Sequence, residues 1–157
     1  MTKKGFAIHL VLLPENKIMD YHVSIIEKKL YSLCEKYNID MKEISIMSDH
    51  MHLLFTMPYS EDKINFAILN RDNFDSFLLE FNESVKDSIE NIFGDTFKWQ
   101  NEVHLMLLPS SHIPILESYI RDQENVHSNM TLEEEIENVF EVKFQSNTDD
   151  KSDGDLF

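Results

Sequence analysis

The segment from His50 to Met57 constrains the fold most strongly, because its residues alternate between two kinds of side chain. In a β-strand, residues two apart point to the same side of the sheet. One face of this strand is therefore wholly apolar: Met51, Leu53, Phe55 and Met57. The other face carries two imidazoles beside a leucine and a threonine: His50, His52, Leu54 and Thr56. We expect helices to cover the apolar face and the imidazoles to project from the opposite one.

The rest of the chain supplies the other elements that such a sheet needs. Further apolar runs predict three more strands, at residues 5–13, 41–48 and 97–108. Apolar residues at helical spacing predict two long helices, at residues 19–37 and 73–93, and Gly94 is a suitable end for the second. The short Ser48-Asp49 connection predicts an antiparallel hairpin. A later helix opens at Ser110 with a hydroxyl cap and an early proline, and Thr131 opens a capping box.

The order of these elements predicts the fold class. Strand, helix, strand, strand, helix, strand is typical of an α+β protein with a ferredoxin-like antiparallel sheet and helices on one face. A C-terminal helix that carries Tyr119 follows the last strand. We expect a single domain over residues 1–145 and an acidic, disordered tail over 146–157. Because no apolar run is long enough to span a bilayer, we expect a cytoplasmic protein with no membrane partner.

The charge of the chain bears on its partners. The formal net charge is −15, from 29 acidic and 14 basic residues. Proteins that bind polyanions usually carry a basic surface, so composition alone favours a protein, a metal or a small ligand as partner. Cys34 is the single cysteine, which excludes an internal disulfide and a multi-cysteine zinc site. Its place in a helical pattern predicts a buried thiol.

Two short segments could carry chemistry. His50 and His52 share a strand face and could hold one divalent ion, since neutral imidazole binds Mn, Fe, Co, Ni or Zn well and Mg poorly. Asp49 could fix the tautomer of a ligand histidine. Tyr119 and Gln123 are neighbours at i and i+4 on a helix. The alternatives are two surface histidines, and a half-buried aromatic beside a solvated amide.

Taken together, these segments resemble a known family. Asp49-His50-Met51-His52-Leu53-Leu54 resembles the HUH motif, in which a hydrophobic residue separates two histidines. The nucleophile helix of the same proteins resembles the segment Tyr119-Ile120-Arg121-Asp122-Gln123-Glu124. The segment before their last strand resembles Phe97-Lys98-Trp99-Gln100, and their late acidic helix resembles Thr131-Leu132-Glu133-Glu134-Glu135. Over residues 5–140 the chain thus resembles the single-tyrosine HUH transposases, which include small insertion-sequence transposases of the TnpA type and REP-associated tyrosine transposases.

The resemblance implies an activity and a site. The implied enzyme cuts and rejoins single-stranded DNA, including hairpin ends, through a 5′-phosphotyrosine, as in DNA transposition. Tyr119 would be the nucleophile, and a divalent metal, Mg or Mn, would be held by His50, His52 and Gln123, with Asp49 in support. The family implies a homodimer in which the tyrosine helix of one subunit serves the histidine pair of the other. Each strand exchange is roughly isoenergetic, so no nucleotide cofactor is expected.

The charge pattern leaves other functions open. Basic segments that the family usually places after the first strand and at the second helix are missing, and residues 61–96 hold nine acidic and three basic residues. A surface with fewer cations for the phosphates binds DNA more weakly. One alternative is therefore a non-catalytic or domesticated descendant that acts as a regulatory or protein-binding module. Another is a metal-binding protein unrelated to transposases.

The remaining histidines have simpler predicted roles. His9 lies on the first strand and could approach the hairpin, but a hydrogen-bonded structural histidine is the favoured interpretation. His104 is interpreted in the same way. His22, His112 and His127 are predicted to face solvent.

Overall fold

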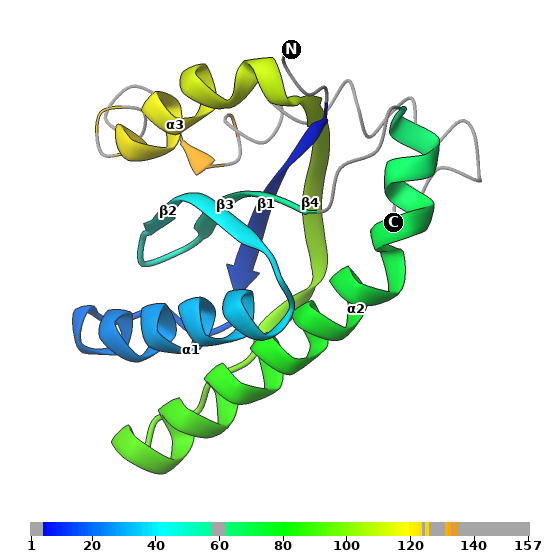
Figure 1. The fold of residues 1–157 in the computed structure, drawn as a ribbon. Helices are drawn as coiled ribbons and strands as arrows, with labels where there is room; N and C mark the ends of the chain where they lie inside the picture. Colours follow the sequence, from blue (N-terminus) through cyan, green and yellow to red (C-terminus); the bar gives the residue numbers. More distant parts are fainter. Residues whose placement is uncertain (1–4, 58–61, 124, 126–130, 133, 135–157) are drawn as a thin grey trace.

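The elements of the computed structural model follow the predicted order (Figure 1). The structure describes residues 5–57, 62–123, 125, 131, 132 and 134. The helices and strands are β1 (Phe6–Pro14), α1 (Val23–Lys36), β2 (Asp40–Ile46), β3 (Met51–Thr56), α2 (Lys63–Ser88), β4 (Trp99–Pro109) and α3 (Ile113–Arg121). The predicted acidic tail, the predicted domain end at 145 and His127 lie outside the described residues.

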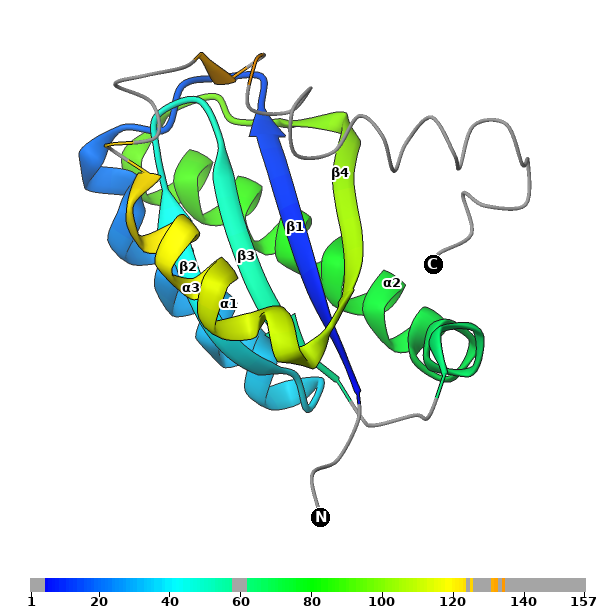
Figure 2. The same cartoon turned by 90° about the horizontal axis from the view of Figure 1, so that it is seen from above.

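The sheet has the predicted ferredoxin-like topology. Its four strands lie in the order β2-β3-β1-β4, and every neighbouring pair is antiparallel. Helices α1 and α2 cover one face, and α3 lies across the other (Figures 1 and 2). The predicted α+β fold class is therefore confirmed.

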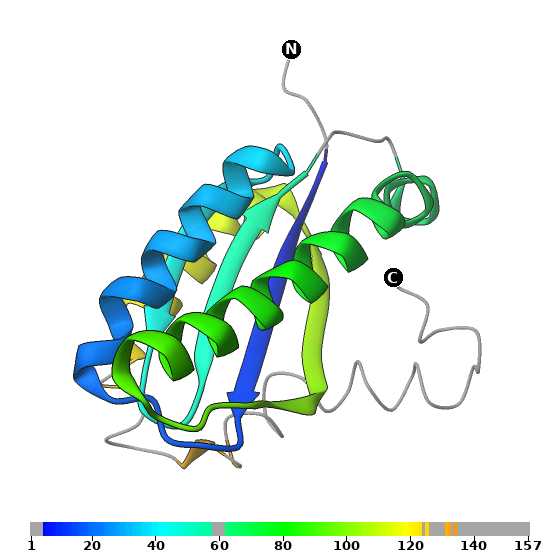
Figure 3. The ribbon, with the colours of Figure 1, turned by 90° about the horizontal axis from the view of Figure 1, so that it is seen from below.

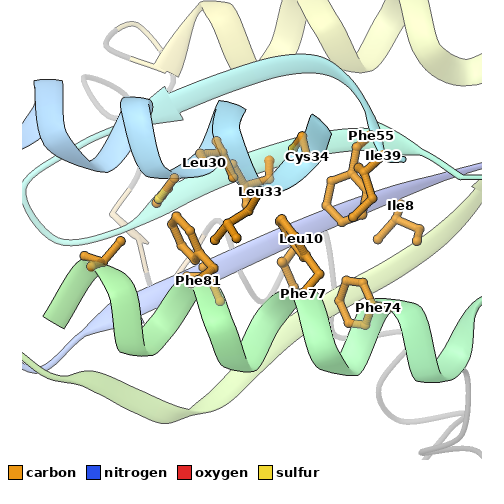
Figure 4. Close-up of a cluster of buried hydrophobic side chains, with 14 of the residues drawn as sticks. Ile8, Leu10, Leu30, Leu33, Cys34, Ile39, Phe55, Phe74, Phe77 and Phe81 are labelled. Atoms are coloured by element: carbon orange, nitrogen blue, oxygen red, sulfur yellow. The ribbon is translucent and has the colours of Figure 1, made fainter. Parts of the chain in front are cut away.

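The hydrophobic core fills the space between the sheet and the two long helices (Figures 3 and 4). The apolar face of β3 contributes Leu53 and Phe55, and α2 contributes an aromatic row against them. The ring centroids of Phe55 and Phe77 are 6.0 Å apart. Cys34 of α1 belongs to the same core, and burial, followed by the charge of Asp40, raises the pKa of its thiol to about 12. The predicted covering of the apolar strand face is confirmed.

Helix α2 begins ten residues earlier than its apolar stripe predicts. The side chain of Asp62 accepts a hydrogen bond from the backbone N–H of Asn65 at 2.8 Å and so caps the helix at Lys63. The first turns contribute less to the core, because Ile64 and Ile68 are 72% and 71% exposed. No helix among the described residues, α2 included, is both long and apolar enough to cross a bilayer.

The remaining helix ends, including the C-terminal end of α2, agree with the sequence in part. A π-helical turn (Ile89–Phe93) extends α2 to Gly94, which adopts the predicted left-handed conformation with φ of 74°. The predicted capping box is confirmed, since Thr131 and Glu134 exchange two side-chain to backbone hydrogen bonds of 2.9 and 3.1 Å. The predicted hydroxyl cap at Ser110 is wrong, because a 3-10 turn precedes α3 and neither has a side-chain cap.

Replacing Phe77 by alanine tests the position of the core. Phe77 is fully buried, so Phe77→Ala should lower the free energy of unfolding by about 3–5 kcal/mol. Leu79→Ala is the matched control on the same helix, because Leu79 is 61% exposed and should lose less than about 1 kcal/mol. Urea unfolding followed by circular dichroism measures both, and equal losses would contradict this packing.

Candidate functional site

The candidate site lies on the sheet face beneath α3 (Figure 2). Strand register decides which side chains share this face. Val11 lies opposite His52 on β3 and His104 on β4, and His9 lies opposite Leu54. The three imidazoles therefore point to the side away from the main core. Helix α3 packs on this face through Ile120, which joins Ala7 and Leu54 in a small apolar cluster.

His50 contacts two of the predicted site residues. Its ring is fully buried, its Nδ1 lies 2.8 Å from Oδ1 of Asp49, and its Nε2 lies 3.0 Å from Oε1 of Gln123. An ionised carboxylate only accepts hydrogen bonds, so Nδ1 carries a proton and donates it to Asp49. Nε2 of the same ring faces Oε1 of Gln123. A neutral histidine that carries its proton on Nδ1 binds a metal through Nε2.

The amide of Gln123 is turned so that its oxygen faces His50. Its Nε2–H donates to the backbone carbonyl of Tyr119 at 3.4 Å, one helical turn back. Nε2 of His50 and Oε1 of Gln123 thus lie 3.0 Å apart, at hydrogen-bond distance. This contact is satisfied either by a ring N–H that donates to the amide oxygen or by a cation that both atoms bind.

His52 is held by a residue whose site role the sequence did not predict. Its Nδ1 lies 2.9 Å from Nε2 of His9, both rings are fully buried, and their planes are nearly parallel with centroids 5.1 Å apart. Burial, followed by the charge of His52, lowers the pKa of His9 from 6.5 to about 3, so His9 is neutral. The predicted hydrogen-bonded character of His9 is confirmed, and its partner is a candidate metal ligand.

Tyr119 lies beside the same imidazoles. Its ring centroid is 5.8 Å from that of His52 and 6.0 Å from that of His9, and both contacts are edge-on. The phenol ring also packs against the Ala7, Leu54 and Ile120 cluster. The structure therefore brings Tyr119, His52 and Gln123 together within one chain.

An ion pair fixes α3 to the edge strand. Arg121 donates to Oε1 of Glu43 at 3.0 Å, and Glu43 lies opposite Leu54 on the site face. Together with the buried Ile120, this contact orients the helix turn between Tyr119 and Gln123. Because the Arg121 side chain is largely exposed to solvent, the ion pair contributes little to the free energy of folding and serves mainly to position the helix.

The remaining histidines differ in burial. The prediction that His22 faces solvent is wrong, because only 2% of it is exposed. Its Nδ1 accepts from the backbone N–H of Met19 at 3.1 Å and its Nε2 donates to Asp95 at 2.8 Å, beneath the rings of Phe93 and Phe97. His112 is exposed as predicted, and His104 is buried on β4.

A metal at this site would need the amide as well as the imidazoles. Within residues 5–57 and 62–123 and the few described later ones, no three His, Cys, Asp or Glu side chains are arranged to hold a metal ion. Gln123 is outside those residue types, and its oxygen is the atom that faces His50. The donor set to be tested is thus two imidazoles and one amide oxygen.

Comparison with known proteins identifies the family. Residues 2–123 match the model of the family described as "Transposase IS200 like". The chain belongs to this transposase family. A search of curated proteins gave no match.

The solved structures that resemble this IS200-like transposase agree in fold. A REP-associated tyrosine transposase bound to a REP hairpin has a TM-score of 0.57 and 15% sequence identity, covering 80% of this chain and 70% of its own. A protein from Deinococcus radiodurans R1 assigned as a transposase has a TM-score of 0.52 and 12% identity, covering 78% of this chain and 93% of its own. At these identities the likeness shows the fold alone.

The family match extends over the whole candidate site. It runs from before β1 to Gln123, and so includes the hairpin with Asp49, His50 and His52 and the helix with Tyr119. The site contact that sequence reasoning did not find is the one between His9 and His52. An imidazole in the middle of a fully apolar strand was the available signal, but only the register between β1 and β3 identifies its partner.

The burial of His9 predicts a pH dependence of stability in this transposase. Because the pKa is lowered to about 3 in the folded state, the unfolded chain binds a proton between pH 6.5 and 3 that the folded chain does not. Stability should therefore fall as the pH falls below 6.5, by up to about 1.4 kcal/mol per pH unit from this group. His9→Gln should have a correspondingly shallower dependence in urea unfolding between pH 7.5 and 4.5. Parallel curves for the two proteins would contradict the buried, neutral assignment.

Proposed function

We propose that this protein cleaves and rejoins single-stranded DNA with a divalent metal, through a 5′-phosphotyrosine at Tyr119, as a step of DNA transposition. The family match supports the transposase role. The observation that supports the chemistry is the contact between Nε2 of His50 and Oε1 of Gln123, two atoms that can bind a metal ion and that lie 3.0 Å apart. His52 is two residues along the strand from His50, and Tyr119 is one helical turn from Gln123.

The residues present fit a divalent cation. The 3.0 Å between Nε2 of His50 and Oε1 of Gln123 would allow both atoms to bind one divalent ion. His50, His52 and Gln123 would hold the ion, and the two imidazoles favour Mn over Mg. When bound, a divalent cation withdraws charge from the scissile phosphate and stabilises the charge that develops on it. Asp49 keeps the proton of His50 on Nδ1, which leaves Nε2 as the binding atom.

Tyr119 supplies the nucleophile in this proposal. Its phenolic oxygen attacks the phosphorus, the new O–P bond forms, and the bond from phosphorus to the 3′ oxygen breaks. The proton lost by the phenol is balanced by the one that the released 3′ oxygen takes up. The downstream strand is then joined to Tyr119 through its 5′ phosphate. The helix that carries Tyr119 also leads into Gln123, so the nucleophile and a proposed metal ligand are held in a fixed relation to each other.

Rejoining reverses the same exchange. A 3′ hydroxyl of a second strand attacks the phosphotyrosine, the bond from phosphorus to Tyr119 breaks, and the phenol recovers its proton. One phosphodiester bond replaces another, so no nucleotide cofactor is needed. The REP-associated neighbour was solved with a hairpin, and we extend that substrate class, a hairpin with a single-stranded flank, to this protein.

A non-catalytic descendant of the fold is the second candidate. The net charge of −15 favours it, because an acidic surface repels the phosphates and so weakens DNA binding. In that case the site would still bind metal while no DNA adduct forms. The experiment below separates the two functions.

A covalent adduct is the direct test. Wild-type protein incubated with Mn²⁺ and a hairpin oligonucleotide labelled at its 3′ end should yield a labelled protein band that survives denaturation. The same oligonucleotide labelled at its 5′ end should yield a shortened free strand with a 3′ hydroxyl. Tyr119→Phe should abolish the adduct, because it removes the attacking oxygen.

Two controls make the result specific. Tyr31→Phe alters an exposed tyrosine on α1, across the sheet from the site, and should leave the adduct unchanged. A chelator should abolish the adduct in the wild type. An adduct that persists in Tyr119→Phe would contradict the proposal. Metal binding by the wild type without any adduct would favour the non-catalytic descendant.

The position of α3 bears on how subunits share the site. The family resemblance implies a homodimer with exchanged tyrosine helices. Here α3 lies on the sheet of its own chain, with Tyr119 beside His52 and Arg121 paired with Glu43. We therefore extend the proposal: each chain, in a homodimer or alone, completes its own site.

Mixing two defective proteins tests this arrangement. Tyr119→Phe lacks the nucleophile and His50→Ala lacks a ligand, so a site within one chain cannot be restored by combining them. Co-expression with two affinity tags, followed by purification through both, gives any mixed dimer for the adduct assay. Recovery of the adduct in the mixed dimer would show that the tyrosine is delivered by the other subunit.

A further inference from the structure

Both candidate ligand imidazoles are held at the same ring atom. Nδ1 of His50 is 2.8 Å from Asp49, and Nδ1 of His52 is 2.9 Å from Nε2 of His9. In each ring Nδ1 is thus engaged by a protein side chain, and Nε2 is the nitrogen through which the ring would bind a metal. Asp49 precedes the HUH motif in sequence, whereas His9 is 43 residues from His52, on the central strand β1.

The hydrogen bond between two neutral imidazoles has two possible directions. If His9 donates from Nε2, the proton of His52 lies on its own Nε2, and that atom cannot bind a cation. If His52 donates from Nδ1, its Nε2 keeps a lone pair and His9 carries its proton on Nδ1. Only the second direction is compatible with metal binding at His52.

The position of His9 holds its contact with His52 in place. Both rings are fully buried, so the hydrogen bond between them is shielded from water and from exchange of partners. His9 lies on a strand paired on both sides, opposite Leu54 and Met106, which fixes its backbone. The ring of His52 lies close to this anchor and to the rings of His50 and Tyr119, whose centroids are 4.9 and 5.8 Å away.

We propose that His9 is a positioning residue of the metal site, which accepts the Nδ1 proton of His52 and thereby presents the Nε2 of His52 to the cation. This inference rests on the proposed function. His9 on β1 would hold the Nδ1 proton of His52, as Asp49 holds that of His50. Removing the Nδ1 partner of a ligand histidine typically lowers metal affinity about 10–100-fold.

Two variants of His9 separate positioning from packing. His9→Gln keeps an acceptor oxygen at nearly the reach of Nε2, and His9→Leu keeps a similar bulk without an acceptor. Titration of each protein with Mn²⁺, followed by the electron paramagnetic resonance of the free ion, gives the affinity. His9→Leu should bind about 10–100-fold more weakly than the wild type, and His9→Gln should recover most of the loss.

The tautomer of His52 provides a readout that needs no DNA. Long-range ¹H–¹⁵N spectra of the histidine rings should show His52 protonated at Nδ1 in the wild type, both without metal and with diamagnetic Zn²⁺. In His9→Leu the ring should relax to a mixture of tautomers. His22→Leu is the control: it removes a buried histidine bonded to Asp95, and should lower stability without changing either readout.

The outcomes distinguish this inference from the proposed function. A His52 ring protonated at Nε2 in the wild type, or a His9→Leu protein with unchanged Mn²⁺ affinity, overturns the role of His9 and leaves the proposed function standing. A wild type that binds no Mn²⁺ overturns the metal-dependent function, and the role of His9 with it. Weak binding in His9→Leu, recovery in His9→Gln and a shifted tautomer together establish the positioning role.

Discussion

The alternation of β3 governs both halves of this molecule. A one-residue step along the strand separates a face that must be buried against α1 and α2 from a face that carries His50 and His52. Both imidazoles are buried, and each buried polar group without a partner costs about 1–3 kcal/mol. On the second face, Asp49, Gln123 and His9 contact the rings and so provide partners for buried ring nitrogens. The stability of this face and the geometry of the candidate site depend on the same hydrogen bonds.

Helix α3 has a double role on that face. It has nine residues, and a helix of this length is marginal alone in water, so its place comes from packing rather than propensity. Ile120 supplies the buried contact and Arg121 the pairing with Glu43. Tyr119 and Gln123 lie on either side of these anchors and are linked by a side-chain to backbone hydrogen bond. A shift of the helix would thus move the proposed nucleophile and the proposed ligand together.

Periodicity predicted the parts of this structure that depend on local pattern. The two faces of β3, the core stripe of α2 and the pairing of Tyr119 with Gln123 on one helix follow from spacings of two, three or four residues, and the hairpin follows from the short connection at Ser48-Asp49. Contacts between strands could not be predicted, because the sequence alone does not give the register of strand pairing. His9 meets His52 through the pairing of β1 with β3, and His22 is buried by Asp95, Phe93 and Phe97 far along the chain. The start of α2 was missed because a polar cap and exposed isoleucines, rather than an apolar stripe, define it.

The position of the acidic residues in the fold decides how their charge affects DNA binding at the site. Residues 61–96 hold nine acidic and three basic residues, and α2 within them covers the sheet face opposite α3 (Figure 3). Exposed charges separated by more than about 8–10 Å are largely screened at physiological salt, and a sheet with its helix layer is at least that thick. The acidic helix therefore opposes DNA at its own surface more than at the site. Among the described acidic residues near the site, Asp49 contacts His50 and Glu43 is paired with Arg121. For DNA bound at the site, base stacking and the cation must provide the binding free energy that a basic surface would otherwise provide. The affinity for DNA should therefore depend on the metal more than on the salt concentration.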